Sequence, residues 1–293
     1  MIYTNNHKLP GILGRALEKN DHKQEGKYSV SQLMDPPQLV ALMRRHAGKM
    51  KKDVTENLWS LLGTAVHWII EKNGGADDLV EQHLVIEVDG IKVSGTPDHF
   101  NLATLELNDW KTTAVYKFVR GGSDDWEAKL NIYAFMIWKK LGKYAKKLYN
   151  RLILRDWQAR EAKFNKTYPQ TPFASIEQEL WTKERVEALL IERLHLHEGT
   201  LKLTDDKLPP CTKEEIWQKD DCYAATKPGN KRAAKLFYGG EDAKIACQEY
   251  CDRLGCELSH RPAVMTRCEG YCAAKNFCVQ YRKAKEKLNG QSS

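Results

Sequence analysis

The chain has 293 residues, 42% of them hydrophobic, with a formal net charge of +7 and a sequence pI of about 8.8. This length allows about two domains, and the composition excludes a chain that is disordered throughout. The moderate positive charge favours a polyanionic partner, although many proteins with such a charge bind none. No apolar run approaches the ~20 residues that span a bilayer, and the N-terminus lacks the layout of a signal peptide, so we expect a cytoplasmic protein without a membrane partner.

All the cysteines lie between Cys211 and Cys278. In a reducing compartment they are poor candidates for disulfides, so their crowding indicates metal ligands or buried thiols. The composition changes near Leu208-Pro209-Pro210, where a tail rich in cysteine and lysine begins. The sequence therefore predicts two domains, residues 1–207 and 208–293.

The segment 55–72 has apolar residues at positions i, i+3, i+4 and i+7, which predicts an amphipathic helix. Gly63, His67 and Glu71 are four residues apart, so they form one stripe along the edge of its apolar face. The runs LVIEV and IKVSG then flank Asp89-Gly90, the dipeptide that a tight type I′ hairpin turn prefers.

A third β-rich run, residues 103–110, is expected to pair next in the same sheet. Because strand side chains alternate, Asp109 and Lys111 point to one face. Asp98 follows the second run, so three antiparallel strands in succession would place it beside this pair. Further elements are expected as a helix, a strand and a helix, over residues 126–141, 150–156 and 177–199.

Two carboxylates with a lysine are suited to phosphodiester hydrolysis. The carboxylates of Asp98 and Asp109 can bind a hard divalent cation, which holds a phosphate and activates water. Lys111 can orient or deprotonate that water and offset charge that develops on phosphorus. The alternative is structural: Asp98 in a turn after Thr-Pro, and the other two side chains as an exposed strand pair.

The motifs around these residues occur in a characteristic order. A helix with G-x-x-x-H-x-x-x-E precedes G-x-P-D, then D-x-K-T, then a helix with a tyrosine element. Residues 29–157 thereby resemble the PD-(D/E)XK nuclease superfamily in its RecB-like branch. The resemblance implies an α/β restriction-endonuclease-like core, a mixed sheet flanked by helices, with a small C-terminal Cys-rich metal-cluster subdomain. It rests on Gly63, His67, Glu71, Gly95, Pro97, Asp98, Asp109, Lys111, Thr112 and Tyr133.

The same resemblance implies roles for individual residues. Asp98, Asp109 and the backbone carbonyl of Trp110 would bind Mg²⁺ or Mn²⁺, with His67 as a ligand or neighbour of the metal. Lys111 would serve the attacking water. Further catalytic and DNA-binding positions are Glu71, Thr112, Lys129 and Tyr133. Lys129 departs from the pattern, because the branch has glutamine there, and lysine meets a phosphate only as a point charge.

The C-terminal cysteines include a triplet with the spacing Cys268-x3-Cys272-x5-Cys278. Cys211, at the junction with the core, is the fourth ligand that we expect. This set resembles the four-cysteine [4Fe-4S] site of some RecB-like nucleases, including CRISPR-associated and phage members. Zn²⁺ is the alternative, since four thiolates suit either group.

A second set of cysteines lies between these ligands. Cys247, Cys251 and Cys256, with Cys222 or His260, could bind zinc by count, but we favour a buried helix face because of the spacing. The segment around Pro228-Gly229-Asn230 is expected to form a basic β-hairpin. Its positively charged side chains are expected either to contact phosphates or to lie in a solvated turn. They are those of Lys227, Lys231, Arg232 and Lys235. The basic segments 49–52 and 139–147 are expected either to contact a single-stranded nucleic acid or to form a solvated helix face.

We therefore expect a divalent-metal-dependent DNA nuclease, an exonuclease that acts on DNA ends or single strands in phage-type recombination or DNA processing. DNA, and a recombination or single-strand annealing protein, are the expected partners, in the host cytoplasm if the protein is phage-encoded. The alternative is a catalytically weak or inactive DNA-binding or recombination-partner protein that retains the fold. Lys129 keeps this alternative open, and the intact Asp98, Asp109 and Lys111 argue against it. The sequence does not exclude RNA as the substrate. A zinc-ribbon regulator is a further alternative, but it would leave Asp98, Asp109 and Lys111 unexplained.

Overall fold

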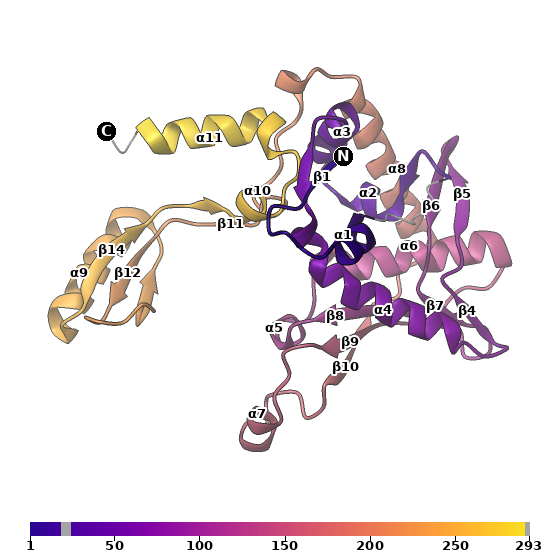
Figure 1. Cartoon of the computed structure of the whole chain (residues 1–293), viewed down its shortest axis with the longest axis horizontal. Coiled ribbons are helices and arrows are strands. Elements are labelled where there is room, and N and C mark those ends of the chain that lie inside the picture. Colours follow the sequence, from indigo (N-terminus) through magenta and orange to yellow (C-terminus); the bar gives the residue numbers. More distant parts are fainter. Residues whose placement is uncertain (19–24, 291–293) are drawn as a thin grey trace. The chain divides into compact units, whose positions relative to one another are not determined.

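The computed structural model describes residues 1–18 and 25–290, and the chain is α/β, with mixed sheets flanked by helices (Figure 1). The chain divides into two compact units. The first unit comprises Met1–Ala41 and Ala47–Leu203, and the second comprises Leu42–His46 and Thr204–Ser293. In the part of the chain that is described, no helix has the length and apolarity needed to cross a membrane.

A five-stranded sheet forms the centre of the first unit. Its middle strand, β8 (Glu106–Thr113), runs parallel to its neighbour β9 (Lys147–Leu154), and the other pairings are antiparallel. The register places Asp109 opposite Asn150. The order β10-β9-β8-β7-β4 is completed by β10 (Phe173–Gln178), β7 (His99–Asn101) and β4 (Asp78–Val80).

A second sheet of three strands carries the predicted hairpin. Strands β5 (Leu84–Val88) and β6 (Ile91–Gly95) are antiparallel, and β2 (Tyr28–Ser29) pairs with β6 in parallel. The turn residues Asp89 and Gly90 have φ of 49° and 71°, the positive values of a type I′ turn, so this prediction is confirmed.

The expected succession of three antiparallel strands in one sheet is wrong. After β6 the chain leaves the three-stranded sheet, and residues 96–98 cross to the five-stranded sheet, where β7 pairs with β8. Asp98 nevertheless lies beside β8, because the backbone N–H of Trp110 donates to its Oδ2 at 2.6 Å. Proximity of the two acids thus depends on a crossing between sheets and not on a meander.

Helices flank these sheets. The expected helices over 55–72 and 126–141 are present as α4 (Leu58–Lys72), after a 3₁₀ turn η1 (Val54–Asn57), and as α6 (Asp124–Leu141). The third expected helix starts later, as α8 (Lys183–Leu201), because residues 173–178 pair with β9 as a strand. The remaining elements of this part are β1 (Ile2–Thr4), α1 (Gly11–Glu18), α2 (Val30–Met34), α3 (Pro37–His46), β3 (Lys51–Asp53), α5 (Val115–Val119) and α7 (Ala159–Phe164).

The two long helices near the cavity differ in burial. On α6, the stretch from Leu130 to Ile137 lies in the main core almost without interruption. On α4, no residue is buried, although the helix is mostly apolar. The predicted amphipathic helix is therefore present, but its apolar side chains are partly or fully exposed.

The second unit contains a small sheet with one covering helix. Strand β12 (Cys222–Thr226) lies between β13 (Lys235–Phe237) and β14 (Glu257–Arg261), and α9 (Gly240–Leu254) packs against β12. The predicted hairpin is confirmed, with Asn230 N donating to Lys227 O at 3.0 Å. Its other elements are η2 (Asp205–Lys207), β11 (Gln218–Lys219), β15 (Val264–Met265), α10 (Thr266–Gly270), η3 (Lys275–Phe277) and α11 (Val279–Gly290).

Gly95, at the end of β6, is expected to tolerate no side chain. A Cβ there would lie 2.8 Å from Tyr133 Cε1 and from Val30 Cγ2. We predict that Gly95→Ala lowers the free energy of unfolding by about 1–3 kcal/mol, measured by urea denaturation, since overpacking forces neighbours apart. Gly63→Ala is the matched control: its Cβ meets nothing within 4 Å, so it should be neutral or stabilise α4 by up to about 1 kcal/mol. Equal effects of the two variants would contradict this packing.

Candidate metal and phosphodiester site

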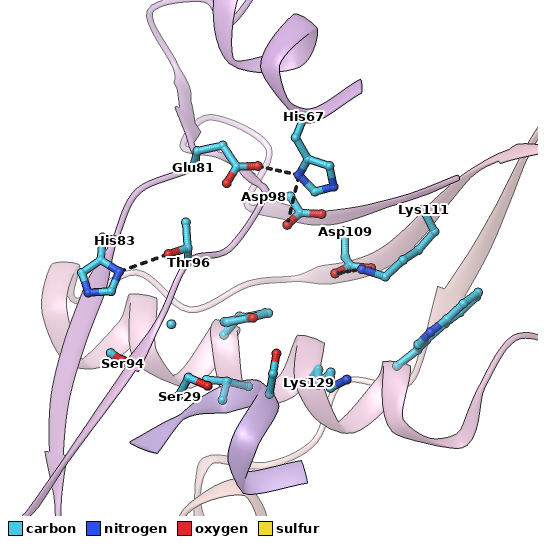
Figure 2. Close-up of a pocket in the computed structure, with 15 residues that line it drawn as sticks. Ser29, His67, Glu81, His83, Ser94, Thr96, Asp98, Asp109, Lys111 and Lys129 are labelled. Atoms are coloured by element: carbon cyan, nitrogen blue, oxygen red, sulfur yellow. Dashed lines mark hydrogen bonds and ion pairs between the residues drawn. The ribbon is translucent and has the colours of Figure 1, made fainter. Parts of the chain in front are cut away.

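A cavity of about 440 Å³ lies in the first unit and collects most of the residues singled out from the sequence. Figure 2 shows polar side chains directed into it from β8, α4 and the segment before β7, with α6 on the opposite side. The residues that line it are Ser29, Val30, Ser31, His67, Glu81, His83, Ser94, Gly95, Thr96, Asp98, Asp109, Lys111, Trp126, Lys129 and Tyr133.

The two predicted carboxylates lie together and are nearly excluded from solvent, with 9% exposure for Asp98 and 7% for Asp109. Lys111 Nζ is 2.7 Å from the Asp109 carboxylate. The buried Asn150 donates from Nδ2 to Asp109 Oδ2 at 2.8 Å. The predicted common face of Asp109 and Lys111 is therefore confirmed, and each carboxylate has at least one fixed donor.

His67 reaches the same cavity from α4. Its Nδ1 is 2.6 Å from Glu81 Oε1 and 3.7 Å from Asp98 Oδ1 (Figure 2). One ligand atom from each of these three residues lies within 4.8 Å of the others, close enough to share a metal ion. Such a donor set, one imidazole and two carboxylates, can hold a divalent metal ion.

Glu81 was missed in the sequence, where Glu71 was expected instead. Glu71 is exposed on α4 and does not line the cavity, since it is one helical turn beyond His67. Glu81 follows β4 with a φ of 49°, and its N–H donates to Asp98 O at 3.1 Å. No spacing rule in the sequence marks it, because its place depends on the pairing of β4 with β7.

The predicted DNA-binding residues are distributed over both units. Lys129 and Tyr133 line the cavity from α6, and Lys129 Nζ pairs with Asp125. Thr112 Oγ1 is buried and finds no hydrogen-bond partner among the described residues. Lys231 and Arg232 are exposed in the hairpin segment of the second unit.

The electrostatics of the cavity follow from two acids buried together. Burial and the charge of Asp109 raise the pKa of Asp98 to about 7. The hydrogen bond that the His67 ring donates to the Glu81 carboxylate raises the pKa of His67, against the effect of burial. Burial alone would lower the pKa of Lys111, but Asp109 and Asp98 outweigh it and raise that pKa. The cavity thus holds carboxylates that repel each other, and a divalent cation bound between them would relieve this repulsion.

The predicted cluster cysteines all belong to the second unit, but the structure does not gather them into a metal site: among the described residues, the group of possible ligand atoms within 4.8 Å of one another is that of His67, Glu81 and Asp98. Burial, Glu215 and the other three thiols raise the pKa of Cys211 to about 12. The backbone of Cys211 is held by the side-chain amide of Gln280, which accepts from its N–H and donates to its C=O, each at 2.9 Å. Gln280 is two residues after Cys278, so this amide ties the distant cysteine to the triplet.

The second set of cysteines packs as a buried helix face. Cys247 and Cys251, on α9, lie in an apolar cluster with Ala225 of β12. Cys222 is buried on the same strand, an odd number of residues away from Ala225, and so points to the other face. The preferred interpretation of this set as packing residues agrees with this arrangement.

No family model matches the sequence, and no curated protein matches it. Among solved structures, the chain is similar to the one described as "Crystal structure of SSO0001". The two share 18% sequence identity with a TM-score of 0.44, over 63% of this chain and 84% of that chain.

The raised pKa of Asp98 predicts a stability cost in the metal-free protein. Because its folded pKa of about 7 exceeds 3.8, the ordinary pKa of an aspartate, the cost is full above pH 7 and is relieved as the pH falls toward 4. We predict that Asp98→Asn raises the melting temperature in EDTA at pH 8, and that this advantage shrinks progressively at pH 6 and pH 4. An advantage that does not change with pH would contradict the assignment.

Proposed function

We propose that this protein is a divalent-metal-dependent DNA nuclease of the RecB-like PD-(D/E)XK type, acting as an exonuclease on DNA ends or single strands. The observation that carries the proposal is the convergence of Asp98, Asp109, Lys111 and His67 in one cavity. Four residues chosen from three separate motifs would not meet in one cavity if each were an isolated surface residue. The α/β architecture, with β8 at the centre of a mixed sheet, supports the restriction-endonuclease-like core.

The residues present fit a divalent cation. His67, Glu81 and Asp98 offer ligand atoms within 4.8 Å of one another, and Asp109 and the carbonyl of Trp110 are the proposed additional ligands. When bound, the cation would supply Lewis-acid stabilisation of the phosphate and a water of lowered pKa. The paired negative charge in the cavity would be neutralised by the same binding, which offsets the cost of burying Asp98.

The chain itself provides the remaining groups. Lys111 stays protonated beside Asp109, so it can hold a water by donation and stabilise charge that develops on the phosphate oxygens. Burial raises the pKa of Tyr133, which keeps its hydroxyl as a donor toward the cavity. Lys129 adds a positive charge on the opposite side, in place of the amide that the branch uses there.

We further propose that Cys211, Cys268, Cys272 and Cys278 hold a [4Fe-4S] cluster that stabilises the C-terminal part of the chain, with Zn²⁺ as the alternative. The sequence spacing of the triplet and the two hydrogen bonds between the Gln280 side-chain amide and the Cys211 backbone, which bring Cys211 near Cys278, support this set. Thiols must be deprotonated to bind metal. Because burial raises the pKa values of Cys211 and Cys268 in the metal-free protein, the cluster or metal ion should bind more tightly as the pH rises.

The nuclease is tested by digestion of end-labelled single- and double-stranded DNA in Mn²⁺, Mg²⁺ or EDTA. We expect cleavage with either metal, and a loss of at least about 100-fold in Asp109→Ala and Lys111→Ala, since general acid–base and electrostatic groups contribute this much. Glu81→Gln should also be impaired, while Glu71→Gln, its matched control, should cleave as the parent does.

Two results would contradict this proposal. DNA binding without cleavage in any metal would favour an inactive DNA-binding protein that retains the fold. Cleavage that survives in Asp109→Ala would place the reaction elsewhere. Parallel digestion of labelled RNA reports whether the substrate is DNA.

The cluster is tested by iron, sulfide and zinc analysis after anaerobic purification. We expect about four iron atoms per chain and absorption near 400 nm, as a [4Fe-4S] cluster bound by four thiolates would give. Both should be lost in Cys268→Ser. Cys256→Ser, outside the proposed set, should retain the iron. A colourless parent with stoichiometric zinc would favour the alternative, and retention of all metal in Cys268→Ser would contradict the ligand set.

A further inference from the structure

An exposed surface with two aromatic rings and two arginines lies beside the cavity; we refer to it as the aromatic–arginine surface. Trp59 of α4 is 66% exposed and Tyr116 of α5 is 61% exposed. The guanidinium of Arg155 lies 4.5 Å from the centroid of the Trp59 ring, and that of Arg120 lies 5.1 Å from the centroid of Tyr116. Each exposed ring is thus paired with a cation.

The aromatic–arginine surface continues from the strand that carries the catalytic residues. Arg155 N donates to the carbonyl of Thr113, which is two residues after Lys111 at the end of β8. The helix α5 follows directly and is held by Val115 N, which donates to Asp156 Oδ1 at 2.7 Å. Trp126, which lines the cavity, packs in the same apolar cluster as Val115. A strand that leaves the cavity along β8 would therefore pass over these rings.

The arginines of this surface differ from the other arginines that stack on rings in the described part of the first unit. Arg185 lies over Trp181 and Arg151 lies over Tyr149, but each also pairs with a glutamate. Within the described residues, neither Arg120 nor Arg155 has an ion pair with a carboxylate. Their charge is consequently available to a phosphate.

We propose that Trp59, Tyr116, Arg120 and Arg155 bind the single-stranded segment of a DNA end whose terminus occupies the cavity. Exposed rings stack on bases without regard to sequence, and the arginines add contacts to the backbone phosphates. This inference rests on the proposed nuclease function and specifies its substrate as a strand with an unpaired end.

Charge selects this occupant over a second copy of the chain. In a symmetric dimer the same patch meets itself, which would bring the uncompensated arginines of both copies together. A polyanion relieves that charge instead. Contact with a second copy is therefore an outcome of the test that overturns the proposal.

The test is fluorescence anisotropy of a labelled oligothymidylate of about 20 nucleotides, longer than the usual single-strand site. It uses the full chain in EDTA, so that binding is measured without cleavage. We expect Trp59→Ala to raise Kd about tenfold, as loss of one stacked base does. Arg155→Ala should weaken binding and reduce the slope of log K against log[salt] by about 0.7. Trp59→Phe should retain most of the affinity.

Trp68→Ala is the matched control. Trp68 is on the same helix and is 59% exposed, and in the part of the chain that the structure describes no cation stacks on it. It should bind as the parent does. Equal loss in both tryptophan variants, or none in either, would overturn the proposal. A change in sedimentation of Trp59→Ala at unchanged oligonucleotide affinity would overturn it in favour of a second copy.

Failure of this inference and failure of the nuclease are distinguishable. If Asp109→Ala abolishes cleavage in Mn²⁺ while Trp59→Ala binds the oligonucleotide normally, the nuclease stands and the aromatic–arginine surface is wrong. If Trp59→Ala weakens binding while no variant or metal supports cleavage, the surface binds DNA and the nuclease is wrong. A blunt duplex of the same length should lose less affinity in Trp59→Ala than the oligothymidylate loses.

Discussion

The burial of two carboxylates in one cavity is the constraint on which the rest of the site depends. Asp98 is fixed by the N–H of Trp110 at 2.6 Å, and Asp109 by Lys111 and Asn150. These donors offset only part of the repulsion between the two carboxylates, and the pKa of Asp98 is therefore raised. A cation bound between the two acids would relieve this repulsion, so the site favours cation binding. Residues that lower stability in this way are common at functional sites.

Local patterns predicted the parts of the fold that local chemistry determines. Asp89-Gly90 needs positive φ and formed the expected turn, and strand alternation placed Asp109 and Lys111 on one face. The crossing between sheets at residues 96–98 and the approach of Glu81 depend on long-range pairing that no period reveals. The strand β10 was likewise missed. Its pairing with β9 determines its conformation, and this long-range contact is not visible in the local sequence, which leads directly into a helix.

The helix α4 was predicted correctly as an element, yet none of its residues is buried. One edge of α4 places His67 at the cavity, and its first turn places Trp59 beside Arg155. The exposure of Trp59 follows from this position beside the site. The period of the sequence could predict the helix, but not which surroundings its apolar residues would have.

The most direct test of the account is the position of the metal. Crystals soaked in Mn²⁺, with anomalous diffraction measured at the manganese edge, locate the ion without reference to activity. The account predicts a peak in the cavity within about 2.0–2.4 Å of oxygens of Asp98 and Asp109, with His67 beside it. Saturating Mn²⁺ that gives no peak there, or one confined to other acidic residues, would contradict it.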